Sequence, residues 1–111
     1  MMQSVHLYLA QRICAMIMAP LVFIHLGVII YAIQGGLSAE EILGRTRGSV
    51  FWMLFYGLFV AAASLHAAIG LRVIAQETLR LRGMIAGILA WGVFAVFFFM
   101  GARAVTAVTL I

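Results

Sequence analysis

Two histidines lie inside apolar stretches of the sequence, and their chemistry is the first thing to explain. His66 precedes Arg72 by six residues, and His25 follows Arg12 by thirteen. If each arginine marks a membrane surface, the helical rise places the His66 backbone about 9 Å and the His25 backbone about 20 Å from it. An imidazole at such a depth needs a partner, because burying an unpaired polar group in hydrocarbon is costly.

The neighbours of His66 on a helical wheel are small. Ala62, Ala63 and Gly70 stand four residues before, three before and four after it. They leave room for a large flat ligand such as haem, whose iron imidazole commonly binds. A neutral histidine that hydrogen-bonds a neighbouring helix would have the same spacing, so the residues alone leave both interpretations open.

His25 and His66 differ in predicted depth by about 10 Å, whereas the two axial nitrogens of one haem iron lie only about 4 Å apart. We therefore expect that they do not bind the same iron. If His66 binds haem, the opposite axial ligand must come from another chain. His25 is then either the ligand of a second haem or a hydrogen-bonding core residue, and we favour the core residue.

Polar side chains around Arg12 form a second candidate group. Tyr8 lies four residues before Arg12, and Gln11 is adjacent to it. A permanently charged guanidinium here could donate hydrogen bonds to a quinone carbonyl or a haem propionate, or it could simply anchor the helix end. Arg72 has the same two interpretations. Cys14 is the only cysteine, so it forms no intrachain disulfide, and we expect it to be a packing residue.

Three long apolar runs must position these residues. The sequence predicts an all-α, integral membrane fold, with transmembrane helices at about residues 8–33, 50–75 and 84–108 of a single transmembrane domain spanning 1–111. The chain is 67% hydrophobic and 9% charged, a balance that a soluble domain of this length does not tolerate. We expect the three helices to pack with a partner subunit.

Shorter features refine this layout. The segment Ser38–Glu41 has the form of a capping box and predicts a short interfacial helical turn within a loop. Pro20 predicts a modest bend in the first helix. The spacing of Gly83 with Gly87, and of Ala86 with Ala90, would let another helix approach closely. The first helix is longer than the core of a signal peptide and has no small-residue cleavage site after it, so we expect it to be retained.

The basic residues are all arginines near predicted helix ends, which indicates topology signals rather than a nucleic-acid-binding surface. The helices divide them into two groups, Arg12, Arg72, Arg80 and Arg82 against Arg45, Arg47 and Arg103. The positive-inside rule then predicts a cytoplasmic N-terminus in a bacterial inner membrane.

Two motifs resemble a known family. The first is QRICA, from Gln11 to Ala15, followed by Pro20. The second is HAAIGLR, from His66 to Arg72, followed by Glu77. They are similar to the helix 1 start and the helix 2 signature of the three-helix membrane-anchor subunits of succinate dehydrogenase (succinate:quinone oxidoreductase) and fumarate reductase. The likeness covers most of the chain, including the short loops.

The resemblance implies a four-subunit complex, in which a flavoprotein and an iron–sulfur subunit dock on two membrane anchors, hetero- or homodimeric. It implies haem b shared with the second anchor and a quinone as electron acceptor or donor. In that comparison His66 matches the axial haem ligand, Arg12 matches an arginine near quinone and propionates, and Tyr8 stands where one anchor type has a quinone-contacting serine. This chain would contain no succinate-oxidising site and no catalytic residue.

The sequence departs from the family pattern at two places. Cys14 and Ala15 replace a common Ser-Gly or Thr-Ala, and Glu77 and Thr78 stand where one anchor type has Asp-Tyr. These departures leave open whether the chain is the cytochrome b subunit or its hydrophobic partner, and some fumarate reductase anchors lack haem. The alternative is a non-redox membrane protein, such as an assembly factor or a small transporter subunit.

Overall fold

The structure is a computed structural model that describes residues 5–81 and 83–110; Arg82, one of the expected topology signals, lies outside them. Three of its helices are long and apolar enough to cross a membrane, and a fourth is short. In chain order the helices are α1 (Val5–Gly35), α2 (Ala39–Thr46), α3 (Val50–Glu77) and α4 (Gly83–Thr109). The described residues include no strand, so the prediction of an all-α membrane fold is confirmed.

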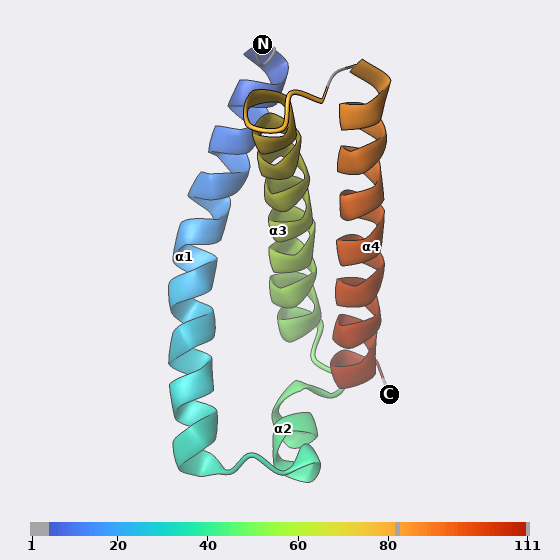
Figure 1. Cartoon of the computed structure of the whole chain (residues 1–111). Helices are drawn as coiled ribbons and strands as arrows, with labels where there is room; N and C mark the ends of the chain where they lie inside the picture. The colour runs from blue at the N-terminus through green and yellow to red at the C-terminus, as the bar shows by residue number, and fades with distance from the viewer. Residues whose placement is uncertain (1–4, 82, 111) are drawn as a thin grey trace.

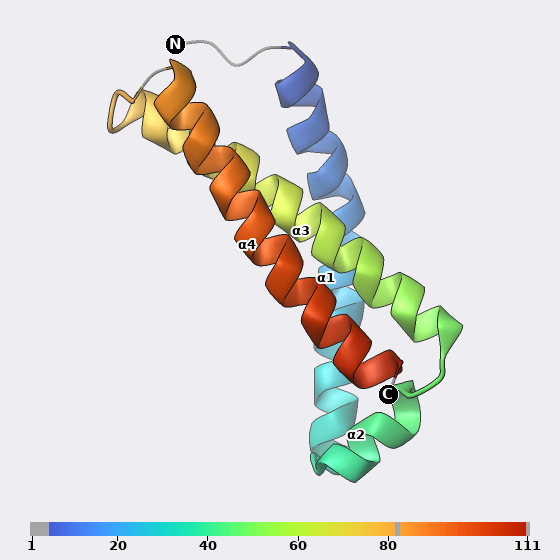
Figure 2. The ribbon, with the colours of Figure 1, turned by 90° about the vertical axis from the view of Figure 1, so that its right-hand side faces the viewer.

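The three long helices run down, up and down again beside one another in the view of Figure 1. The start of α1, the end of α3 and the start of α4 lie at one end of the molecule, and α2 lies at the other. Figure 2 shows that α3 and α4 stay side by side along their length, whereas α1 crosses them at an angle. The start of α1 and the end of α4 therefore lie on opposite sides of any membrane that the three helices span.

The observed helices extend past the expected bounds by a few residues. α1 begins at Val5, ends at Gly35 and runs without a break through Pro20. The second half of the first loop is also more helical than the predicted single turn, because α2 has eight residues. Its first turn is capped as the sequence predicts: the Ser38 hydroxyl accepts a hydrogen bond from the Glu41 amide, and the acidic side chains of this turn interact favourably with the positive end of the helix dipole.

Helices α3 and α4 pack tightly at Gly101, in the second half of α4. A Cβ atom added to Gly101 would lie 2.5 Å from Val60 Cγ1, so only a glycine fits there without movement. A Cβ added to Gly83 or Gly87 would meet nothing within 4 Å, whereas Ala86, which lies between them, is fully buried. Of the small residues at the start of α4, Ala86 is therefore packed within this chain, and the two glycines leave space beside them.

Two hydrogen bonds join the end of α2 and the residues that follow it to the end of α4. The Thr46 hydroxyl donates to the Val108 carbonyl at 2.7 Å, and the Gly48 amide donates to the Thr109 carbonyl at 2.7 Å. Carbonyls in the last turn of a helix have no partner in their own helix, so these donors satisfy groups that would otherwise need water. They fix the short α2 segment against α4.

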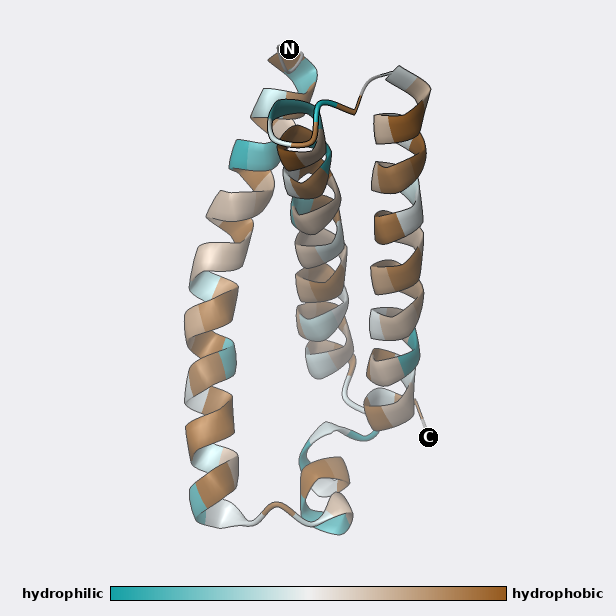
Figure 3. Cartoon of the chain, in the orientation of Figure 1, coloured by the Kyte–Doolittle hydropathy of each residue, from teal (hydrophilic) through white to brown (hydrophobic). Residues whose placement is uncertain are grey.

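Many large apolar side chains on the three long helices are exposed, and the ribbons of these helices are coloured mostly brown, for hydrophobic residues, in Figure 3. Phe23 and Trp91 are each 74% exposed, and Met84 is 79% exposed. Apolar surface of this extent is stable in lipid or against another hydrophobic subunit, but not in water. The polar positions gather toward the helix ends and the connecting loops.

Candidate functional site

The His66 side chain faces α1, where it meets Cys14. The imidazole Nδ1 lies 3.7 Å from Cys14 Sγ, within hydrogen-bonding distance for sulfur. His66 is half-buried and Cys14 is 3% exposed, so the contact lies in the interface between α1 and α3. The imidazole is therefore turned toward another helix of the protein, as a functional histidine in a membrane span requires.

Gln11, one helical turn before Cys14, contacts the Cys14 thiol. Cys14 Sγ lies 3.3 Å from the backbone oxygen of Gln11 and 3.8 Å from its side-chain Oε1, and in both contacts the thiol is the donor. The Gln11 side chain also crosses to α3, because a Cβ added to Gly70 would lie 3.5 Å from Gln11 Nε2. Gln11 and Cys14 on α1 thus oppose His66 and Gly70 on α3, and we call these four residues the His66 seam.

Arg12 and Tyr8 form a separate pair on the exposed surface of α1. Arg12 Nη1 donates a hydrogen bond to the Tyr8 hydroxyl at 3.4 Å, and the guanidinium lies 5.8 Å from the centre of the Tyr8 ring. Beside them, Gln11, Arg12, Ala15, Met16 and Ala19 line a shallow cavity of about 360 Å³. Gln11 therefore borders both this cavity and the His66 seam.

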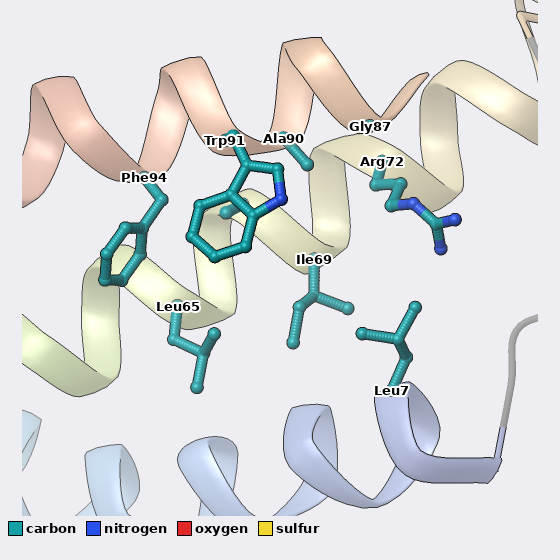
Figure 4. Close-up of a pocket in the computed structure, with 9 residues that line it drawn as sticks. Leu7, Leu65, Ile69, Arg72, Gly87, Ala90, Trp91 and Phe94 are labelled. Carbon is teal, nitrogen blue, oxygen red and sulfur yellow. The ribbon is translucent and has the colours of Figure 1, made fainter. Parts of the chain in front are cut away.

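Arg72 lies on a different face of α3. It lines an apolar cavity of about 380 Å³ between α1, α3 and α4. Figure 4 shows Arg72 at one end of this cavity, Phe94 at the other, and the Trp91 indole between them. Leu7 reaches into the same space from α1. Arg12 and Arg72 thus line separate cavities, so the structure does not bring all the expected cofactor-binding residues into one site.

His25 lies in an aromatic environment nearer the opposite end of the molecule. Its ring centre is 6.0 Å from that of Tyr56 and 5.3 Å from that of Phe59, both in edge-on geometry. It borders a cavity of about 820 Å³ that α1, α2 and α3 enclose, with Arg45 among the lining residues. Phe59 precedes His66 by seven residues, or about 10 Å of helix, so the two histidines occupy different levels of the same interface.

The residues at His66 fit one axial ligand of a haem. One ring nitrogen is engaged by Cys14, and among the described residues the other, Nε2, has no hydrogen-bond partner. A neutral imidazole with one nitrogen anchored and the other open is the donor that haem iron uses. The described residues contain no group of three or more His, Cys, Asp or Glu side chains that could hold a bare metal ion.

Sequence reasoning missed the contact between Cys14 and His66, because it treated Cys14 as a packing residue. The available signal was local: Gln11 and Cys14 are spaced by three residues, and His66 and Gly70 by four, so each pair shares one helix face. What was missing is the rotation of α1 relative to α3, which decides whether these two faces meet.

Comparison with known proteins gives one match. A family model described as "Succinate dehydrogenase/Fumarate reductase transmembrane subunit" matches residues 2–105, which is nearly the whole chain. None of the curated proteins and none of the solved structures matches the chain. The family match spans all three long helices and includes both motifs that the sequence analysis identified.

Proposed function

The chain belongs to the family of succinate dehydrogenase/fumarate reductase transmembrane subunits, and from this premise we propose that it anchors the soluble subunits of such a complex and contributes to a haem b and a quinone site. It is an integral membrane subunit, with three helices suited to span the bilayer. The observation that carries the proposal is the half-buried His66 imidazole, which α1 holds by one nitrogen.

His66 is the axial ligand that this chain provides. Cys14 contacts the imidazole from the α1 side, Gln11 contacts Cys14 in turn, and the small residues Ala63 and Gly70 flank the imidazole on α3. Haem, when bound, would supply a one-electron carrier between the soluble subunits and the quinone. A second membrane anchor, identical or different, would complete the haem site, because His25 packs on Phe59, which lies about 10 Å of helix before His66.

Arg12 is the quinone-facing group. It is exposed on α1, it lines the 360 Å³ cavity together with Gln11, and its charge does not depend on pH. A guanidinium donates hydrogen bonds to a carbonyl oxygen and stabilises the negative charge that develops there on reduction. Tyr8 holds one end of the guanidinium, so the pair presents a preformed donor at the membrane surface. Arg72, in its separate cavity, supports a propionate or the helix end.

The end of the molecule that carries Arg12 is where the flavoprotein and iron–sulfur subunits dock. The loop after α3 exposes Glu77, Thr78 and Arg80 at that end. The arginine distribution favours a cytoplasmic position for it, in a bacterial inner membrane. Electrons from a flavin would then reach the haem and the quinone from the same side.

Haem content and the optical spectrum of the purified complex test the proposal. We expect His66→Ala to abolish the bis-histidine b-type spectrum, and the matched variant His25→Ala, on the same interface, to retain it. Haem that survives His66→Ala with an unchanged spectrum would contradict the assignment of the ligand.

Steady-state quinone reduction tests the role of Arg12. We expect Arg12→Gln to raise the KM for quinone by about tenfold, which corresponds to about 1.4 kcal/mol for a lost charged hydrogen bond. Arg47→Gln, on the loop at the opposite end, should leave the KM unchanged. Equal KM values in the two variants would exclude a quinone contact at Arg12.

A further inference from the structure

The thiol of Cys14 has two hydrogen-bond acceptors on its own helix. Both belong to Gln11, the backbone oxygen at 3.3 Å and Oε1 at 3.8 Å. A thiol has one S–H donor, and its sulfur can also accept a weak hydrogen bond. When the hydrogen is directed to the nearer Gln11 oxygen, the sulfur lone pairs face α3, where His66 Nδ1 lies 3.7 Å away.

This geometry selects one tautomer of His66. If the thiol hydrogen points to Gln11, an unprotonated Nδ1 would face the sulfur with one lone pair against another. A protonated Nδ1 instead donates to the sulfur and leaves the lone pair on Nε2. Which ring nitrogen of a histidine binds a metal is set by the hydrogen bond that the other nitrogen makes.

We propose that Cys14 is a positioning residue for His66: with its own hydrogen held by Gln11, the sulfur accepts from Nδ1–H and fixes both the ring orientation and the tautomer whose Nε2 binds iron. This inference rests on the proposed function. It assigns a role to the position at which the chain departs from the family pattern, since Cys14 stands where a hydroxyl residue is common.

The strength of the Nδ1 hydrogen bond should tune the haem. A stronger acceptor at position 14 makes the imidazole more electron-donating, which stabilises ferric iron and lowers the reduction midpoint potential. A hydroxyl oxygen is a stronger acceptor than a thiol sulfur, and a methyl group is no acceptor. The midpoint potential should therefore rise in the order Cys14→Ser, wild type, Cys14→Ala.

Redox titration of the haem in the assembled complex tests this order. We expect Cys14→Ser to shift the reduction equilibrium constant about threefold toward the oxidised form, roughly 30 mV for one electron, and Cys14→Ala to shift it by a similar factor in the opposite direction. The g-values of the low-spin ferric haem should move with the potential. Ser64→Ala is the control: Ser64 is also buried, two residues before His66, and should leave potential and g-values unchanged.

The outcomes separate this inference from the proposed function. A haem that depends on His66 but has the same potential and g-values in wild type, Cys14→Ser and Cys14→Ala would overturn the role of Cys14 alone. A complex without a His66-dependent haem would overturn both.

A readout that needs no haem is the S–H stretching band of Cys14, isolated as the infrared difference between wild type and Cys14→Ala. We expect that band to shift in His66→Leu, because the sulfur then loses its donor. An unshifted band would show that the thiol and the imidazole do not interact.

Discussion

Helix α3 packs against two neighbours in different ways. Against α4 the contacts are small and apolar, with Gly101 beneath Val60 and with Ala86 fully buried. Against α1 the contacts join polar or aromatic side chains, with His66 on Cys14 at one level and His25 on Phe59 at another. One face of α3 thus determines how the helices are held together, and the other presents groups that can do chemistry.

The difference follows from what each kind of contact requires. Close backbone approach depends on small side chains, and without a hydrophobic driving force in lipid it is such packing that holds helices together. Helix α1, which carries the polar contacts to α3, crosses α3 and α4 at an angle instead of running alongside them (Figure 2). The predictions below test whether the two interfaces separate in this way.

The largest effect on stability should come from Gly101→Ala. An added Cβ would lie 2.5 Å from Val60 Cγ1, so the Val60 side chain or the two helices must shift, and overpacking of this kind costs about 1–3 kcal/mol. The thermal midpoint of the chain in the solubilised complex should fall. Gly92→Ala, where an added Cβ meets nothing within 4 Å, should not lower it. Equal midpoints would mean that α3 and α4 are not tightly packed at Gly101.

A smaller loss is expected from Thr46→Val. The Thr46 side chain is buried and its hydroxyl bonds the Val108 carbonyl, so an isosteric apolar group leaves that acceptor without its donor, at about 1 kcal/mol. The control is Thr106→Val, because the Thr106 hydroxyl is exposed and bonds only Arg103 of its own helix. Midpoints that fall alike in both variants would argue against a role for Thr46 in joining α2 to α4.

Gly70→Ala adds a methyl group at the interface between α3 and α1, as Gly101→Ala does between α4 and α3. The added methyl would meet Gln11 Nε2 at 3.5 Å, an ordinary van der Waals distance, so we expect a change within about 0.5 kcal/mol. The thermal midpoint of the solubilised complex, measured alongside that of Gly101→Ala, tests this expectation. A loss as large as that of Gly101→Ala would show that α1 packs on α3 as tightly as α4 does.

The smallest effect is expected from His25→Phe. A phenyl ring can keep the edge-on contacts with Tyr56 and Phe59, so the thermal midpoint should not change. His25→Ala removes the ring and should cost about 0.5–1.5 kcal/mol for the lost aromatic contacts. If His25→Phe were as damaging as His25→Ala, a ring nitrogen of His25 would be needed, and this level of the interface would resemble the His66 seam.

Much of the fold could be predicted from the sequence, because an apolar run long enough to cross a bilayer is a local property of the chain. The three long helices were expected within a few residues of their bounds, and the N-cap at Ser38 was visible as a motif. The length of α2 could not be predicted from the sequence, because its last turn is fixed by a contact to α4. In that contact the Thr46 hydroxyl bonds the Val108 carbonyl, 62 positions away in the chain.

The sequence by itself determined that His66 lies deep in a membrane helix beside small residues, because position and spacing along one helix set depth and face. Only the tertiary structure decided which residue its imidazole meets. The rotation and crossing angle of α1 bring Cys14, rather than Arg12, against the ring, and they place Arg72 in another cavity. These angles arise from packing along whole helices, and no short segment of sequence encodes them.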